Sequence, residues 1–232
     1  MCASFAATFP ISWNRFTEIW CCDFEYRIDR NDLPVPVCLC AIEMRTGREI
    51  FLWRSELLTL RRAPFDVGAR SLIVSFSSNA EMLCFLRLGW PLPENVIDPY
   101  VLTAALTNGS RRWPHRNFRP GLLDALRLFG LQGLESTEKE AIRNLIVANE
   151  TYTAEQRKLI ARYCRSDVVA TCALLLEQAG QIDVSRGTVS ESGRASGTTR
   201  AAGGHAGSRS PHVELGAAEA RRHPPLRGPS LL

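Results

Sequence analysis

Two pairs of side chains in this sequence have types and spacing that bring chemically active groups together on one face of an element. The first pair is Asp23 and Glu25, inside an aromatic and apolar run over 18–26 that predicts a β-strand. Side chains two positions apart in a strand share one face, so these carboxylates lie side by side and repel each other. A hard divalent cation bound by both oxygens relieves that repulsion. The alternative for this pair alone is a strand with one face in water.

The second pair is Tyr163 and Asp167, in a run over 153–178 whose apolar residues recur at helical spacing. Positions i and i+4 share one helix face, so the phenol and the carboxylate point the same way. Valines directly follow the aspartate, and a half-buried carboxylate there needs a partner. The alternative is an ordinary surface ion pair with Arg162 or Arg165.

The rest of the pattern places strands first and helices later. Apolar and aromatic runs predict strands over 18–26, 35–44, 49–53 and 71–76. Short turns join the first three, which predicts an antiparallel meander, and the continuous apolar fourth run predicts a buried strand. Helical spacing and stop signals predict a short helix near Leu57 and helices over 80–88, 122–129, 137–147 and 153–178, the last two opened by capping boxes at Thr137 and Thr153. The sequence therefore predicts an α/β protein with a mixed sheet and helices packed on it.

Taken together, the two pairs resemble the first and third motifs of the 3′–5′ exonuclease (proofreading) domain of family A DNA polymerases, within the DEDD exonuclease superfamily. The resemblance covers about 19–178 and includes the helical segment 122–130. It implies a ribonuclease-H-like fold, with an antiparallel meander plus a parallel strand. The exonuclease-like domain is expected over 1–184.

The middle motif of that family is an acidic residue at the start of a helix that follows a strand. Glu81, in Asn79-Ala80-Glu81, stands at the matching position and is one methylene longer than the usual aspartate. Asp98, in Ile97-Asp98-Pro99, is the other candidate. We prefer Glu81, and the longer side chain puts activity rather than fold in question.

The resemblance implies hydrolysis of the terminal phosphodiester at a 3′ end. Two divalent cations, Mg²⁺ or Mn²⁺, neutralise the phosphodiester and activate water in such reactions. Their expected ligands are Asp23, Glu25, Glu81 and Asp167, and Tyr163 is expected to orient the attacking water. The expected partner is the 3′ end of single-stranded DNA, with RNA left open because its recognition depends on contacts to the 2′-hydroxyl.

A basic loop between the middle and last motifs could contact the nucleic-acid backbone. Its candidate residues are Arg111, Arg112, His115 and Arg116. The alternative is a solvated loop. Lys139 is expected at a solvated helix start.

Composition assigns the net charge of +4 to the C-terminal segment. Residues 185–232 hold seven arginines against three glutamates, which leaves 21 basic and 21 acidic residues elsewhere. This segment is rich in Gly, Ser, Ala, Arg and Pro and has no aromatic residue, so a disordered tail is expected. Its abrupt start suggests a truncated or frame-shifted gene, because the family domain is usually followed by a polymerase domain.

The cysteines and the apolar runs indicate in which cellular compartment the protein is expected. No CxxC pair occurs among the eight cysteines, which are expected to be buried, reduced and apolar in character. No run of about 18 apolar residues predicts a membrane span, and no basic residue precedes the apolar N-terminus as in a secretory signal. The expected location is the cytoplasm.

Three alternatives to a DNA exonuclease remain open. The chain could be a catalytically inactive nucleic-acid-binding remnant of a truncated polymerase. It could be an RNA exonuclease of the RNase D branch of the same fold. It could also be a structural α/β protein, which requires the acidic positions to coincide by chance. Whether a polymerase acts in trans is unknown from sequence.

Overall fold

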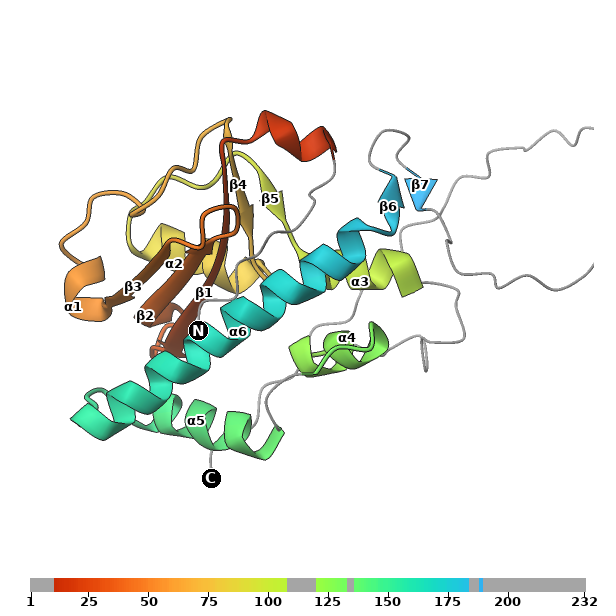
Figure 1. Cartoon of the computed structure of the whole chain (residues 1–232). Helices are drawn as coiled ribbons and strands as arrows, with labels where there is room; N and C mark the ends of the chain where they lie inside the picture. The colour runs from red at the N-terminus through yellow and green to blue at the C-terminus, as the bar shows by residue number, and fades with distance from the viewer. Residues whose placement is uncertain (1–10, 108–119, 133–135, 184–187, 190–232) are drawn as a thin grey trace, which may run out of the picture. The chain divides into compact units, whose positions relative to one another are not determined.

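The computed structural model describes residues 11–107, 120–132, 136–183 and 188–189. Its centre is a five-stranded sheet in the order β3-β2-β1-β4-β5 (Figure 1). The strands are β1 (Glu18–Ile28), β2 (Pro34–Glu43), β3 (Glu49–Trp53), β4 (Ser71–Val74) and β5 (Val96–Ile97). β1 pairs antiparallel with β2, and β2 with β3, whereas β1 pairs parallel with β4, and β4 with β5. The predicted mixed sheet, a meander plus a parallel strand, is confirmed.

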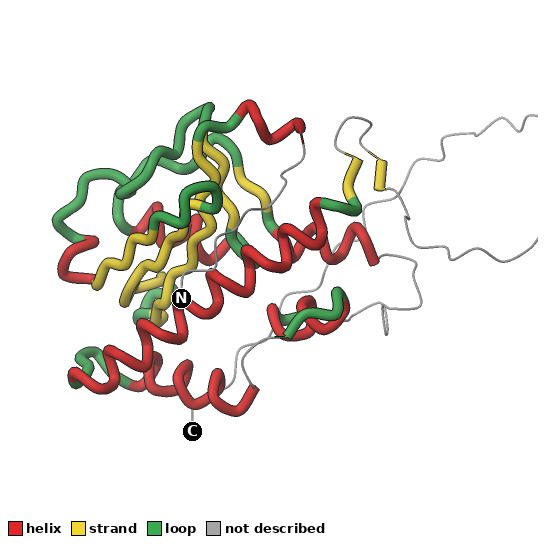
Figure 2. The backbone as a smooth tube through the Cα atoms, in the orientation of Figure 1, coloured by secondary structure: helices red, strands yellow, loops and turns green. Residues whose placement is uncertain are grey.

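Helices cover both faces of this sheet (Figure 2). They are α1 (Arg54–Leu57), α2 (Asn79–Arg87), α3 (Pro99–Thr107), α4 (Leu122–Leu128), α5 (Ser136–Ala148) and α6 (Ala154–Ala179), after a 3₁₀ turn at Ile11–Arg15. α5 and α6 pack on one face, and α1 and α2 on the other. The arrangement matches the expected ribonuclease-H-like α/β architecture.

Alternation along β1 divides its side chains between the two faces. Trp20 and Phe24 pack with Phe85 and Trp90 in the core on the α2 side. Cys21 lies in the other core, where its thiol is 3.5 Å from the carbonyl oxygen of a valine in α6. Phe24 therefore points away from the α6 side, as strand alternation predicts.

α6 is the longest helix and joins most of the domain together. The Thr153 hydroxyl accepts a hydrogen bond from the Gln156 N–H, and the Gln156 side chain accepts one from the Thr153 N–H, so the predicted capping box is confirmed. Farther along, Leu174 packs against Ala125 and Leu126 of α4. α6 thus contacts the sheet and α4 together.

Several elements were not expected from sequence, and one boundary differs. The 3₁₀ turn at Ile11–Arg15, β5, α3 and the strand pair Ile182–Asp183 and Thr188–Val189 were not predicted. α5 begins at Ser136, so the predicted cap residue Thr137 lies inside the helix. No helix among the described residues is long and apolar enough to cross a membrane.

The expected C-terminal tail, 185–232, lies outside the described residues except for the two-residue strand β7 (Thr188–Val189), which pairs with β6 (Ile182–Asp183). The boundary at 184/185 therefore remains a prediction. The basic candidates Arg111, Arg112, His115 and Arg116 also lie outside the described residues.

Candidate metal centre

Asp23 and Glu25 lie at the centre of the sheet, on the face that α6 covers. They pair with Cys40 and Cys38 of β2, and a register shift follows Glu25. Oxygen atoms of Asp23 and Glu25 and the sulfur of Cys164, in α6, all lie within 4.8 Å of one another. The Cys164 thiol is 3.6 Å from Asp23 Oδ2. The strand pair predicted from sequence is therefore a compact cluster.

The two strand carboxylates have strongly perturbed acidities. Burial, followed by the charge of Asp167, raises the pKa of Asp23 from 3.8 to about 8. Burial and the charge of Asp23 raise the pKa of Glu25. Without a cation both carboxylates therefore hold a proton more tightly than a free carboxyl group does, which is the behaviour expected of carboxylates brought together to bind positive charge.

α6 brings Tyr163 and Asp167 close enough to the two strand carboxylates for their charges to interact. Burial raises the pKa of Asp167, while Lys139 and a hydrogen bond from Tyr163 oppose that rise. Burial and the charge of Asp167 raise the pKa of the Tyr163 phenol, so it is protonated at any working pH. The spacing of the two residues thus has the predicted result, a phenol and a carboxylate on one helix face.

Lys139 is the unexpected member of this group. Its ammonium forms an ion pair with Asp167 Oδ1 at 2.5 Å, and the two side chains are 12% and 15% exposed. The ammonium also lies 5.6 Å from the centroid of the Tyr163 ring, a cation–π distance. The expectation that Lys139 is solvated is wrong. The alternative that Asp167 forms a surface ion pair with Arg165 is also wrong, because Arg165 pairs with Glu49.

Glu81, in the first turn of α2, is buried and only 3% exposed. Burial raises its pKa most, followed by the charge of Asp23 and that of Asp98. Its Oε2 atom has no hydrogen-bond partner among the described residues. A buried carboxylate oxygen without a donor is costly, and a cation would satisfy it.

Asp98 has a different environment. Its carboxylate accepts hydrogen bonds from the backbone N–H groups of Ser77, Ser78 and Tyr100 and from the Ser78 hydroxyl. These bonds place Asp98 as the cap at the start of α3 and as a support for the turn that leads into α2. Ser77 has a positive φ of 61° in that turn, a conformation uncommon for a non-glycine residue.

Three thiols lie beside Asp23 and Glu25. Cys164 is within hydrogen-bonding reach of Cys38 and Cys40, and burial raises its pKa. All seven cysteines among the described residues are free and buried, as predicted. The proximity of Cys164 to Asp23 was not predicted, because sequence spacing does not show which cysteine of a helix faces a strand carboxylate.

The residues present fit a cation. Asp23, Glu25, Glu81 and Asp167 come from β1, α2 and α6. Burial raises the pKa of all four, and the charge of a neighbouring carboxylate adds to the rise for Asp23, Glu25 and Glu81. One lysine offsets part of this charge at Asp167. Hard divalent ions prefer such oxygen ligands, and the orphaned Glu81 oxygen adds a further one.

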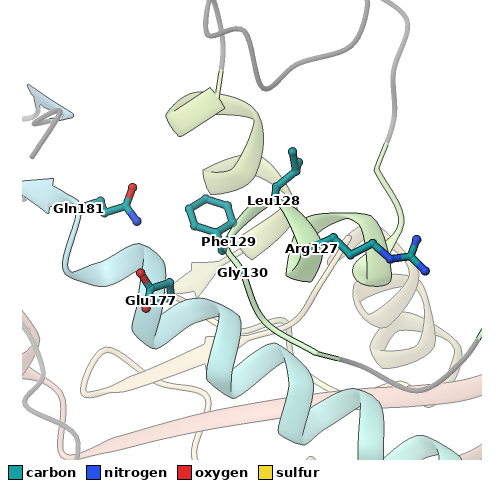
Figure 3. A pocket seen from close by; sticks show the side chains of 6 residues that line it. All are labelled: Arg127, Leu128, Phe129, Gly130, Glu177 and Gln181. Atoms are coloured by element: carbon teal, nitrogen blue, oxygen red, sulfur yellow. The ribbon is translucent and has the colours of Figure 1, made fainter. Parts of the chain in front are cut away.

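Two pockets differ in their relation to these residues. The larger, about 570 Å³, lies between the end of α4 and the C-terminal half of α6. Figure 3 shows Phe129 on the side of Glu177 and Gln181, while Arg127 extends away. None of the four carboxylates lines this pocket. The smaller, about 330 Å³, is lined by Lys139, Asp167 and two arginines of α6. Of the four carboxylates, Asp167 lines the smaller pocket, beside Lys139.

Comparison with solved structures supports the fold. The structure of RNase D from Trypanosoma brucei matches with a TM-score of 0.51 and 17% sequence identity, over 72% of this chain and 59% of that one. RNase D from Escherichia coli matches with a TM-score of 0.43 and 16% identity, over 73% of this chain and 42% of that one. The EXO domain of Aedes aegypti Nibbler matches with a TM-score of 0.44 and 13% identity, over 71% and 80%. This chain thus spans 59% of the length of the first of these proteins.

No model of a known protein family matches the chain, and no curated protein matches it by sequence. The similarity to T. brucei RNase D therefore shows the fold alone. It agrees with the ribonuclease-H-like architecture expected from the two motif pairs.

Proposed function

We propose that this chain is a metal-dependent 3′–5′ exonuclease that hydrolyses the terminal phosphodiester of a single-stranded nucleic acid. The observation that carries the proposal is the cluster of Asp23 and Glu25 oxygens within 4.8 Å, together with the buried Asp167, whose charge acts on Asp23, and the buried Glu81 with its unpartnered oxygen. A solvated strand face explains neither the burial nor the unpartnered oxygen. The shared fold with T. brucei RNase D supports the same reaction class.

The ligands of two divalent cations, Mg²⁺ or Mn²⁺, would be Asp23, Glu25, Glu81 and Asp167. When bound, such ions supply charge neutralisation of the phosphodiester and activation of water. Glu81 is preferred to Asp98 as the middle ligand because the Asp98 oxygens already accept four hydrogen bonds.

The protonated Tyr163 phenol has a separate role. In the metal-free protein its hydroxyl donates a hydrogen bond to Asp167, and once a cation occupies that carboxylate the same proton could be donated to the attacking water and fix its orientation. Because the pKa of the phenol is raised, it remains a donor throughout the neutral range. Tyr163 therefore orients water and takes no part as a base.

The substrate class is the second part of the proposal. DNA is the substrate that the likeness to proofreading domains implies, whereas the fold comparison supports an RNA exonuclease of the RNase D type equally well. The 2′-hydroxyl distinguishes the two polymers, so direct competition separates them. The free cysteines support a reducing compartment such as the cytoplasm as the place of action.

An inactive nucleic-acid-binding remnant is the second candidate, and one observation favours it. Lys139 occupies the carboxylate of Asp167, where a divalent ion would bind. If the chain is such an inactive remnant, Lys139 permanently takes the place of the divalent ion at Asp167.

The test is a nuclease assay on 5′-labelled single-stranded DNA and on RNA of the same sequence, with Mg²⁺ or Mn²⁺. We expect a ladder that shortens from the 3′ end, abolished by EDTA and by Asp23→Ala. Glu155→Gln is the matched control, because Glu155 is an exposed carboxylate in the first turn of α6. Absence of cleavage by folded wild-type protein with either metal would favour the inactive remnant.

A further inference from the structure

Lys139 lies in an unfavourable position for its own helix. It is the fourth residue of α5, within the first turn, where the helix dipole disfavours positive charge. Its ammonium is nonetheless nearly buried, with 12% of its side chain exposed. The position is therefore maintained by its contacts, the Asp167 carboxylate and the face of the Tyr163 ring.

The ion pair also relieves the repulsion within the carboxylate cluster. The charge of Asp167 raises the pKa of Asp23 and of Glu25. Lys139 lowers the pKa of both Asp167 and Asp23. One ammonium thus partly neutralises the same group of carboxylates that a divalent cation would.

We infer that Lys139 is a resident cation that competes with a divalent ion for Asp167. Loading of the ion displaces the ammonium from Asp167 Oδ1. The displaced ammonium then faces the pocket of about 330 Å³ that Arg162 and Arg165 also line, where it can contact a backbone phosphate. The inference rests on the proposed role of Asp167 as a metal ligand.

The geometry of the pocket supports this exchange. Lys139 and Asp167 both line it, so the ammonium can leave the carboxylate without crossing the core. The flexible stem of a lysine permits such a movement more easily than a planar guanidinium would. The metal-free and the metal-loaded states would then differ in the partner of one side chain rather than in the fold.

The first experiment measures Mn²⁺ affinity by electron paramagnetic resonance in the absence of nucleic acid. We expect Lys139→Met to bind Mn²⁺ about tenfold more tightly or better, because a charge-assisted hydrogen bond no longer opposes the ion. Lys158→Met is the matched control, since Lys158 is the other lysine of the chain and pairs with Glu155 at the surface. An affinity of Lys139→Met that equals or falls below that of wild type overturns the inference.

The second experiment uses the wild-type protein and needs no variant. Because the chain has two lysines, labelling with ¹³C-lysine gives two sets of Cε–Hε signals, which Lys158→Arg assigns. Saturation with diamagnetic Mg²⁺ is expected to shift the Lys139 signal and to leave that of Lys158 in place. An unmoved Lys139 signal in Mg²⁺-saturated protein overturns the inference.

These readouts do not depend on turnover. Metal competition in a protein without nuclease activity would leave the inference intact and remove the proposed function. Nuclease activity with unchanged metal affinity in Lys139→Met would do the reverse. Binding of no metal by either protein would overturn both.

Discussion

Replacement of Asp23 by asparagine is expected to stabilise the metal-free protein, and to do so more strongly as the pH rises. Burial and the charge of Asp167 raise the pKa of Asp23 from 3.8 to about 8. The folded protein therefore binds this proton more tightly than the unfolded chain, so Asp23 lowers stability progressively as the pH rises from about 4 to about 8. Asparagine keeps the shape of the side chain and removes the charge.

The linkage relation gives the magnitude. For this shift, the destabilisation due to Asp23 is about 2 kcal/mol at pH 5 and about 4 kcal/mol at pH 7. Asp23 retains partial contact with solvent, which reduces the cost of its charge, so we expect about half of that difference. The advantage of Asp23→Asn over wild type should thus grow by about 1 kcal/mol between pH 5 and pH 7, or about 2–4 °C in Tm.

The assay is urea unfolding in EDTA at several pH values, with Glu155→Gln as the exposed control. Saturating Mg²⁺ should reverse the order, because the ion binds the native wild type and loses a ligand in the variant. A stability difference that stays constant between pH 5 and pH 7 in EDTA would refute the reasoning. So would equal stabilisation of both proteins by Mg²⁺.

Four further changes test other parts of the structure. Tyr163→Phe should lower kcat by about 10- to 100-fold with little change in KM or Tm, since only the water-orienting hydroxyl is lost; a steady-state assay measures this. Glu81→Gln should raise the Tm in EDTA at a pH above the ordinary pKa of a glutamate and weaken Mg²⁺ binding, because it removes a buried carboxylate of raised pKa. Asp98→Ala should instead cost about 2 kcal/mol in urea unfolding, because three N–H groups and a hydroxyl lose their acceptor. Thr153→Ala should cost about 1 kcal/mol through loss of the α6 cap, and a cost near zero would contradict the hydrogen bonds at that position.

Local periodicity was sufficient to predict the residues that lie on one element. Strand alternation placed Asp23 and Glu25 on one face, and the i, i+4 spacing placed Tyr163 beside Asp167. The same reasoning gave the meander, because its turns are short. It also separated Phe24 from Asp23.

Contacts between distant segments could not be predicted in this way. Lys139 reaches Asp167 across 28 positions, and Cys164 reaches Asp23 across 141. Neither lysine nor cysteine carries a local sign of its partner. For α3 the signal was present, since Asp98 and Pro99 form the usual cap and first residue of a helix. An aspartate near the middle motif is also a candidate metal ligand, and that second interpretation hides its role as a cap.

The length of α6 has a consequence for the dynamics of the site. The helix that carries Tyr163 and Asp167 also packs in the main core and against α4, so these positions cannot open without loss of most of the core. Amides around Asp167 are therefore expected to exchange with deuterium only through global unfolding, at the slowest rates in the protein. Half of the candidate site would then have the kinetic stability of the whole domain, and thermal inactivation would follow global unfolding rather than a local change.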